Sequence, residues 1–344
     1  MDFSLSAEQQ ALADTASRWA AANFGSAVLR AALDGVPFRF EEVWQQLADF
    51  GWLGINVPGG LGGSDGTLVD ACVIAEQLSR HLAPIPFTGN AVIAAAAGLL
   101  MADGVREQVL SDLAAGTRTF ALVLDDHLVW PPGSISGVAW EWTPTSSLLV
   151  PDGRCLVAVD GLPCEALEPQ DLLRTLARVR GIEPYPPDLS DPEWRFLAVT
   201  HVAMAACLVG AMAGALGLAV EHAKTRQQFG RPIGSFQAVQ HICADMLVDV
   251  ETSRTAMYGA AWAADNLPGR AALTAAATAK AWACAAAKRV CEAAIQVHGG
   301  MGFTWECDVH LFLRSAVLCA DAFGGEPGAL DTVAADVFEG SSLP

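Results

Sequence analysis

The sequence predicts an α+β protein with an N-terminal helical domain, a small middle β domain and a C-terminal four-helix bundle. Hydrophobic residues make up 52% and charged residues 17% of the 344 positions, which is typical of a folded chain. Apolar residues recur at helical spacing up to about residue 115 and again beyond about residue 190. Between these regions lie short segments rich in β-forming residues. We therefore expect domains at residues 1–116, 117–188 and 189–344.

Charge and cysteine usage narrow the class of function. A net charge of −18 argues against nucleic acid and anionic membrane surfaces as partners. So few charged residues also favour surface that is buried in an oligomer. The nine cysteines include no C-x-x-C pair, so we expect reduced thiols and no zinc site. The N-terminal MDFSLSAEQQ has no basic or apolar signal region, which together with reduced thiols predicts a cytoplasmic protein.

The first region should begin with a capped helix. Ser6 and Gln9 form a capping box, and the amphipathic pattern continues to about Phe24. A second helix is expected over 41–52, with Val43, Leu47 and Phe50 on its apolar face. After the glycine-rich loop VPGGLGGSDG, two more helices are expected over 67–83 and roughly 90–103.

The middle region should form a small antiparallel sheet. The expected strands are TFALVL, HLVW, VAWEW, SLLV and CLVAV. Aromatic residues stand in or beside these strands at Trp130, Trp140 and Trp142. Their rings either stack on a ligand or pack in the core, and strand aromatics more often do the latter.

The third region should be a bundle of long helices. Residues 202–220 are apolar enough to cross a membrane, but Ala and Gly dominate and no aromatic belt flanks them, which favours a buried bundle helix. A stripe of apolar residues at steps of three and four marks a second helix: Phe236, Val239, Cys243, Met246 and Val250. The Ala-rich segment 269–297 predicts a third.

Three segments carry a resemblance to a known family. They are WQQLADFGWLGINVPGGLGG, which precedes a helix containing Glu76, then TRQQFGRPIGSFQAVQHICADM, and AIQVHGGMGFTWE, with Arg314 beyond it. In this order and spacing they resemble the flavin-dependent acyl-CoA dehydrogenases along nearly the whole chain. The resemblance implies a helical–β–helical fold, FAD as cofactor and an acyl-CoA as substrate.

In that family the C-terminal motifs hold the FAD of a neighbouring subunit. The resemblance assigns this role here to Arg226, Phe229, Gln237, Gln296, Gly299 and Gly300. An arginine fork suits a pyrophosphate, glycines allow close backbone approach, and amides suit adenine and ribose edges. Each residue also has a plainer interpretation: Arg226 can answer a helix dipole, and the glycines can form an ordinary turn. We expect His298 beside them to be a packing or loop residue.

The sequence departs from the family where the flavin ring and the thioester would bind. The T-E-P-x-x-G-S-D loop and the W-I-T strand of the family are both missing from the middle region. The family's reaction removes the proton alpha to the thioester and passes a hydride from the beta carbon to the flavin, so it needs a carboxylate base. Family members place that glutamate at one of two positions, which fall here on Thr200 and Phe323. Neither side chain can accept the proton, so the sequence predicts no catalytic base at these positions.

Other acids lie near these positions. Asp321 and Glu326 flank Phe323 and could substitute if the loop shifted; otherwise they are solvated loop acids. Glu193 precedes Thr200 by seven residues, about 10 Å along a helix, which is too far to replace it.

Retention of the C-terminal motifs and loss of the base resemble the smaller subunit of heteromeric acyl-CoA dehydrogenases from actinobacteria. These are α2β2 complexes associated with oxidation of CoA-activated steroid side chains. The resemblance implies a partner subunit that carries the catalytic glutamate, the flavin-ring contacts and the acyl pocket. Two alternatives stay open: a self-sufficient homo-oligomer that uses Asp321 or Glu326, and a scaffold subunit that binds no flavin. The acyl chain, the partner, the stoichiometry and FAD binding without the partner cannot be read from the sequence.

Overall fold

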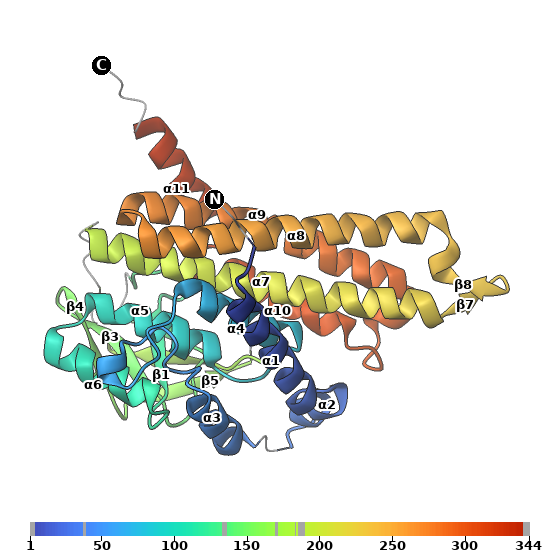
Figure 1. Ribbon diagram of the computed structural model, residues 1–344. Helices are drawn as coiled ribbons and strands as arrows, with labels where there is room; N and C mark the ends of the chain where they lie inside the picture. Colours follow the sequence, from blue (N-terminus) through green and yellow to red (C-terminus); the bar gives the residue numbers. More distant parts are fainter. Residues whose placement is uncertain are drawn as a thin grey trace.

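The computed structural model describes residues 4–36, 39–132, 136–168, 171–182, 184 and 190–339. A long helical bundle forms one side, and the N-terminal helices and the sheet pack against one half of its length (Figure 1). The other half of the bundle extends away from them and ends in the β7–β8 hairpin, formed by Gln227–Gln228 and Arg231–Pro232 (Figure 1).

The N-terminal helices agree with the predicted pattern and add two elements. The helical segments are α1 (Ala7–Asn23), α2 (Ser26–Leu33), α3 (Phe40–Asp49), α4 (Leu68–Arg80), the π-helix η2 (Thr88–Ala94), α5 (Ala95–Ala97) and α6 (Asp103–Ala114), with 3₁₀ turns at Gly59–Leu61 and Gly98–Leu100. The Ser6–Gln9 capping box is present as predicted. Phe50 was expected on the apolar face of α3, but it follows the helix end and is half exposed.

The middle region is a six-stranded sheet with the order β4-β3-β1-β2-β6-β5. Its strands are β1 (Phe120–Leu124), β2 (Ser136–Trp140), β3 (Ser147–Asp152), β4 (Cys155–Val159), β5 (Cys164–Leu167) and β6 (Leu176–Arg180). The sheet is mixed, because β1 pairs in parallel with β3, so the prediction of a purely antiparallel sheet is wrong. The predicted strand HLVW is a turn, in which Leu128 has a φ of 59°.

Four helices form the C-terminal bundle as predicted, and a fifth follows them. They are α7 (Asp191–Thr225), α8 (Gln237–Asn266), α9 (Gly269–His298), α10 (Val309–Asp321) and α11 (Gly325–Glu339). The 18-residue apolar stretch of α7 is long enough to span a membrane, but 83% of it is buried inside the protein. It is therefore explained as the central helix of the bundle.

Two glycines let α7 lie this close to its neighbours. A Cβ at Gly210 would stand 2.3 Å from the carbonyl oxygen of Glu76 in α4. A Cβ at Gly214 would stand 2.2 Å from the Phe312 ring in α10 and 2.5 Å from the Arg80 carbonyl oxygen. Any larger residue would force these helices apart, so the small side chains set the position of α7 in the core.

Candidate functional site

The hairpin at the far end of the bundle presents the first predicted motif. Helix α7 ends at Thr225, and Arg226 turns into extended backbone with a ψ of 124°. Phe229 and Gly230 form the two-residue turn with φ values of 53° and 77°, the geometry that matches the twist of a tight hairpin. This turn leaves the Phe229 ring 92% exposed at the tip.

The second motif ends α9 at the same end of the bundle. Gly299 has a φ of 64°, which terminates the helix, and a Cβ at Gly299 or Gly300 would meet no atom within 4 Å. The rings of His222 in α7 and His298 in α9 stack with centroids 4.4 Å apart, which brings the two helix ends together. His298 also bonds through Nδ1 to the Ala294 carbonyl at 2.8 Å, so the structure explains it as a packing residue, as expected.

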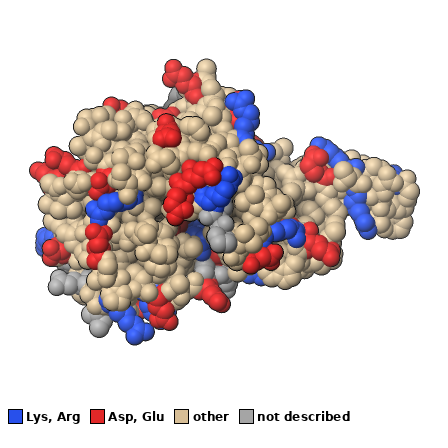
Figure 2. Space-filling view, turned by 90° about the horizontal axis from the view of Figure 1, so that it is seen from below, with Lys and Arg blue, Asp and Glu red and all other residues tan. Residues whose placement is uncertain are grey.

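The six predicted cofactor residues thus lie at one end of the bundle, and all are exposed: Arg226, Phe229, Gln237, Gln296, Gly299 and Gly300. We call this set the bundle-end patch. Its surroundings combine uncharged surface with basic side chains, as the narrow end of the molecule in Figure 2 shows. Burial, then His298 and Arg226, lower the pKa of His222, which keeps its ring neutral and able to stack. Open backbone at two glycines beside an exposed arginine fits the phosphate and ribose part of a dinucleotide.

The two base positions lie elsewhere, beside the sheet, and both are closed. Phe323 is 4% exposed with a φ of 55°, and its ring meets the fully buried Trp140 edge-on at 6.1 Å. Its N–H donates to the Leu128 carbonyl at 2.6 Å. Thr200 is fully buried, and its hydroxyl donates to the Leu197 carbonyl of its own helix at 2.8 Å. Neither position offers a group that could take a proton from a substrate.

Two buried bases hold the loop at Phe323 from below. Lys280 of α9 donates to the carbonyl of Phe323 at 3.0 Å and to that of Ala322. Burial lowers the pKa of Lys280 to about 8. Burial, followed by the nearby Lys280, lowers the pKa of His201 to about 3, and the His201 ring is hydrogen-bonded to the Phe323 backbone. These contacts fix the loop, so it is anchored in place by α7 and α9.

The fallback acids stand on other sides of this loop. Asp321 is exposed and lines an open pocket of about 370 Å³ together with Asp126 and His127. Glu326 lies partly exposed in the first turn of α11. Neither lines the larger cavity described below. Glu193 is buried at the start of α7, and the helix continues without a break to Thr200, as the spacing argument assumed.

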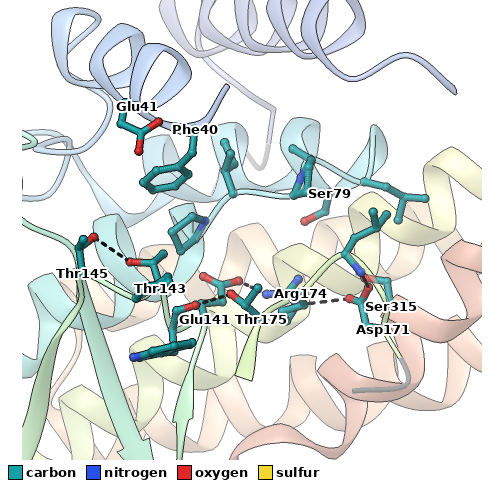
Figure 3. Close-up of a pocket in the computed structure, with 18 residues that line it drawn as sticks. Phe40, Glu41, Ser79, Glu141, Thr143, Thr145, Asp171, Arg174, Thr175 and Ser315 are labelled. Atoms are coloured by element: carbon teal, nitrogen blue, oxygen red, sulfur yellow. Dashed lines mark hydrogen bonds and ion pairs between the residues drawn. The ribbon is translucent and has the colours of Figure 1, made fainter. Parts of the chain in front are cut away.

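The tryptophans divide between core and cavity. Trp130 and Trp140 are buried, and their rings pack against Phe196 and Phe323. Both are thus core residues, the more frequent of the two alternatives. Trp142 follows β2 and lines a cavity of about 560 Å³ between the N-terminal helices, the sheet and α10 (Figure 3).

A buried charge cluster closes one wall of this cavity. Arg174 pairs with Glu141 and, at 3.5 Å from its Nε, with Asp171 (Figure 3). Glu141 also accepts the backbone N–H of Gly89 at 2.5 Å. Burial raises the pKa of Asp171 to about 6. Sequence reasoning missed this cluster, because its members are separated by up to 85 positions and none belongs to a motif; only the acid beside Trp140 and Trp142 hinted at it.

No metal centre accompanies these groups. Across the described ranges of the chain, no group of three or more His, Cys, Asp or Glu side chains is placed to hold a metal ion.

Comparison with known proteins agrees with this arrangement. Residues 6–117 match the family model described as Acyl-CoA dehydrogenase, N-terminal domain, and residues 193–335 match Acyl-CoA dehydrogenase, C-terminal domain. Acyl-CoA dehydrogenase IpdE2 of Mycobacterium tuberculosis is 34% identical over 323 residues, covering 90% of this chain and 91% of that protein. Acyl-CoA dehydrogenase FadE34 of the same organism is also 34% identical, over 92% of this chain but only 46% of its own length.

Solved structures show the same fold over the full chain. The ChsE4-ChsE5 complex from Mycobacterium tuberculosis contains a chain that superposes with a TM-score of 0.84 at 25% identity, covering 100% of both chains. A variant of the Tcur3481-Tcur3483 steroid ACAD gives a TM-score of 0.83 at 26% identity, covering 98% of this chain and 99% of that one. With both terminal domains matched and a relative of this identity aligned along its length, the chain belongs to the acyl-CoA dehydrogenase family of FAD-dependent oxidoreductases.

Proposed function

We propose that this chain is the subunit of a heteromeric acyl-CoA dehydrogenase that binds the adenine and pyrophosphate part of FAD and carries no catalytic base. The partner subunit supplies the glutamate, the flavin-ring contacts and the acyl pocket. The substrate we propose is the CoA thioester of a steroid side chain. The observation that carries the proposal is the contrast between the exposed bundle-end patch and the filled base position at Phe323.

The distance between these two regions supports the need for a second chain. Thr200 and Arg226 are 26 positions apart on one continuous helix, α7, and its end. At 1.5 Å per residue they are separated by about 39 Å, longer than a dinucleotide extends. One FAD therefore cannot reach from the bundle-end patch to the base position of the same chain. The patch serves a flavin whose ring lies in another subunit.

The relatives support the finer part of the proposal. The two structural relatives above are a two-protein complex and a two-protein steroid ACAD by their printed descriptions. Assembly with an unlike, catalytic acyl-CoA dehydrogenase chain is therefore the arrangement we propose here.

The residues have defined tasks in this arrangement. FAD, when bound, supplies the hydride acceptor. Arg226 donates in a planar fork to the pyrophosphate, and the open backbone at Gly299 and Gly300 lets phosphate oxygens approach N–H groups. Gln237 and Gln296 donate and accept at adenine and ribose edges. Phe229, exposed at the hairpin tip, covers apolar surface of the neighbouring subunit and excludes water there.

Flavin content tests the proposal. The chain purified alone should hold close to no FAD, and its co-expressed complex with a catalytic acyl-CoA dehydrogenase should hold FAD and oxidise an acyl-CoA. A flavin-to-chain ratio near one for the isolated chain would instead support a self-sufficient enzyme.

Arg226→Ala in the complex should strip FAD, because it removes the charged partner of the pyrophosphate. A loss of two charged hydrogen bonds corresponds to roughly 3 kcal/mol, or about a hundredfold weaker binding. Arg106→Ala is the matched control: it also removes one exposed positive charge, from an i,i+3 pair on α6, away from the patch. Unchanged flavin content in Arg226→Ala, with the complex intact, would leave the scaffold alternative.

Asp321→Asn and Glu326→Gln should leave the rate of the complex unchanged, because neither carboxylate faces the closed base position. Steady-state oxidation of the same acyl-CoA measures this. Loss of turnover in either variant, at unchanged flavin content, would show that this chain supplies a base after all.

A further inference from the structure

Two buried cysteines from different helices meet beside the charged wall of the large cavity. Cys207 lies in the middle of α7 and Cys319 in α10, and their thiols are hydrogen-bonded to each other. The Cys207 sulfur also lies 3.4 Å from the Thr88 hydroxyl and is hydrogen-bonded to Ser79 and Arg174. Both cysteines are free and nearly fully buried. A pair of sulfurs in contact, from segments over a hundred positions apart, is a potential disulfide.

The surroundings favour the anionic form of one sulfur. Cys319 donates to Cys207, which lowers the pKa of Cys207, and the guanidinium of Arg174 adds to the effect. The pKa of Cys319 is raised for the complementary reason. A thiolate beside an arginine, with a second thiol in contact, is the arrangement of a nucleophilic cysteine and its resolving partner.

The cavity gives a small oxidant a way to this pair. Ser79 and Arg174 both line the 560 Å³ cavity and both contact the Cys207 sulfur, so a single layer of side chains separates the sulfur from open space. Ser315, one helical turn before Cys319, lines the same wall (Figure 3). No other described cysteine is hydrogen-bonded to a second thiol in this structure.

We propose that Cys207 and Cys319 form a redox-active dithiol that hydroperoxides oxidise to a disulfide. The Cys207 thiolate attacks one peroxide oxygen, the O–O bond breaks, and the departing hydroxide takes a proton to become water. The sulfenic acid on Cys207 is then attacked by the Cys319 sulfur; the S–O bond breaks, and the hydroxyl leaves as water with the Cys319 proton. The two thiols lose two electrons, and the peroxide gains them. The product links α7 to α10 directly before the loop that holds Phe323.

Peptide mapping of the native chain tests this. The full-length protein is treated with hydrogen peroxide, quenched with catalase, unfolded in an alkylating agent and digested. Mass spectrometry should find the Cys207 and Cys319 peptides linked, with both thiols lost about tenfold faster than Cys291, which is equally buried but raised in pKa by its apolar surroundings. Reduction with dithiothreitol should restore both thiols.

Three variants sharpen the test. Cys207→Ser should abolish the link and leave Cys319 reduced, whereas Cys319→Ser should trap Cys207 as a sulfenic acid that dimedone labels. Cys291→Ser should behave as wild type. A thermal melt of each variant checks that it folds. The proposal is wrong if, in the folded chain, exposed Cys155 is oxidised while Cys207 and Cys319 stay reduced, or if the link forms only after unfolding.

Discussion

The bundle-end patch and the loop at Phe323 stand on the same helix, yet one is open and the other is closed. At the patch, an arginine, two glutamines and a phenylalanine point outward from a hairpin and two helix ends, and two glycines have no neighbour within 4 Å of a Cβ. At the loop, Phe323 fills the base position against Trp140, and Lys280 holds its carbonyl. The difference shows that one chain can retain a family's cofactor surface while its own reaction centre becomes core.

Exchanging each phenylalanine for alanine should separate the two regions most clearly. Phe323→Ala leaves a cavity beside Trp140 and should lower the free energy of unfolding by about 3–5 kcal/mol. Phe229→Ala removes an exposed ring and should change it by less than about 0.5 kcal/mol, but should lower FAD content in the complex. Urea unfolding and flavin absorbance measure both. Equal destabilisation by the two substitutions would break the comparison.

Acid should act on the closed region. The pKa of His201 is about 3 in the folded chain, below its ordinary 6.5, because burial and Lys280 disfavour its charge. Below pH 6.5 the unfolded chain therefore takes up a proton that the folded chain refuses. Between pH 6.5 and about 3, His201 should cost roughly 1.4 kcal/mol of stability per pH unit. Urea unfolding at several pH values should show a shallower slope by this amount for His201→Asn, while His127→Asn, an exposed control, keeps the wild-type slope. Equal slopes in all three proteins would contradict this.

Within the patch, the two adjacent glycines should differ. Gly299 has φ 64° and ψ −145°, a conformation that side chains disfavour, so Gly299→Ala should cost about 1–3 kcal/mol. Gly300 has no such backbone constraint and has open space around it, so Gly300→Ala should leave stability nearly unchanged. Any loss of FAD in Gly300→Ala would then report on close approach of the phosphate rather than on folding. Thermal unfolding of the two variants, beside their flavin content in the complex, makes the measurement.

The local part of this architecture was predictable from sequence. The Ser6–Gln9 capping box and the long bundle helices follow from spacing alone, and the two C-terminal motifs located the patch. The strands were harder. β5 and β6 are four and five residues long, and the HLVW segment failed because Leu128 adopts a positive φ that its β-forming neighbours do not reveal.

What sequence could not supply were the contacts between distant positions. The pairing of Arg174 with Glu141, the meeting of Cys207 with Cys319 and the bonds from Lys280 all join segments that carry no shared pattern. The parallel pairing of β1 with β3 has the same cause, because β2 lies between them in the chain but on the other side of β1 in the sheet. Motifs describe what a segment presents, whereas packing decides what it meets.

The unbroken course of α7 makes its length a constrained quantity. Gly210 and Gly214 fix the middle of the helix against α4 and α10, and the reaction centre and the patch are attached on either side of them. Deleting one residue after Gly214 would draw the patch in by 1.5 Å and turn it by about 100° around the helix axis. An arginine aimed at a partner's pyrophosphate would then face away from it. Substitutions along this stretch of α7 can accumulate one at a time, but insertions and deletions there would have to arrive in whole turns.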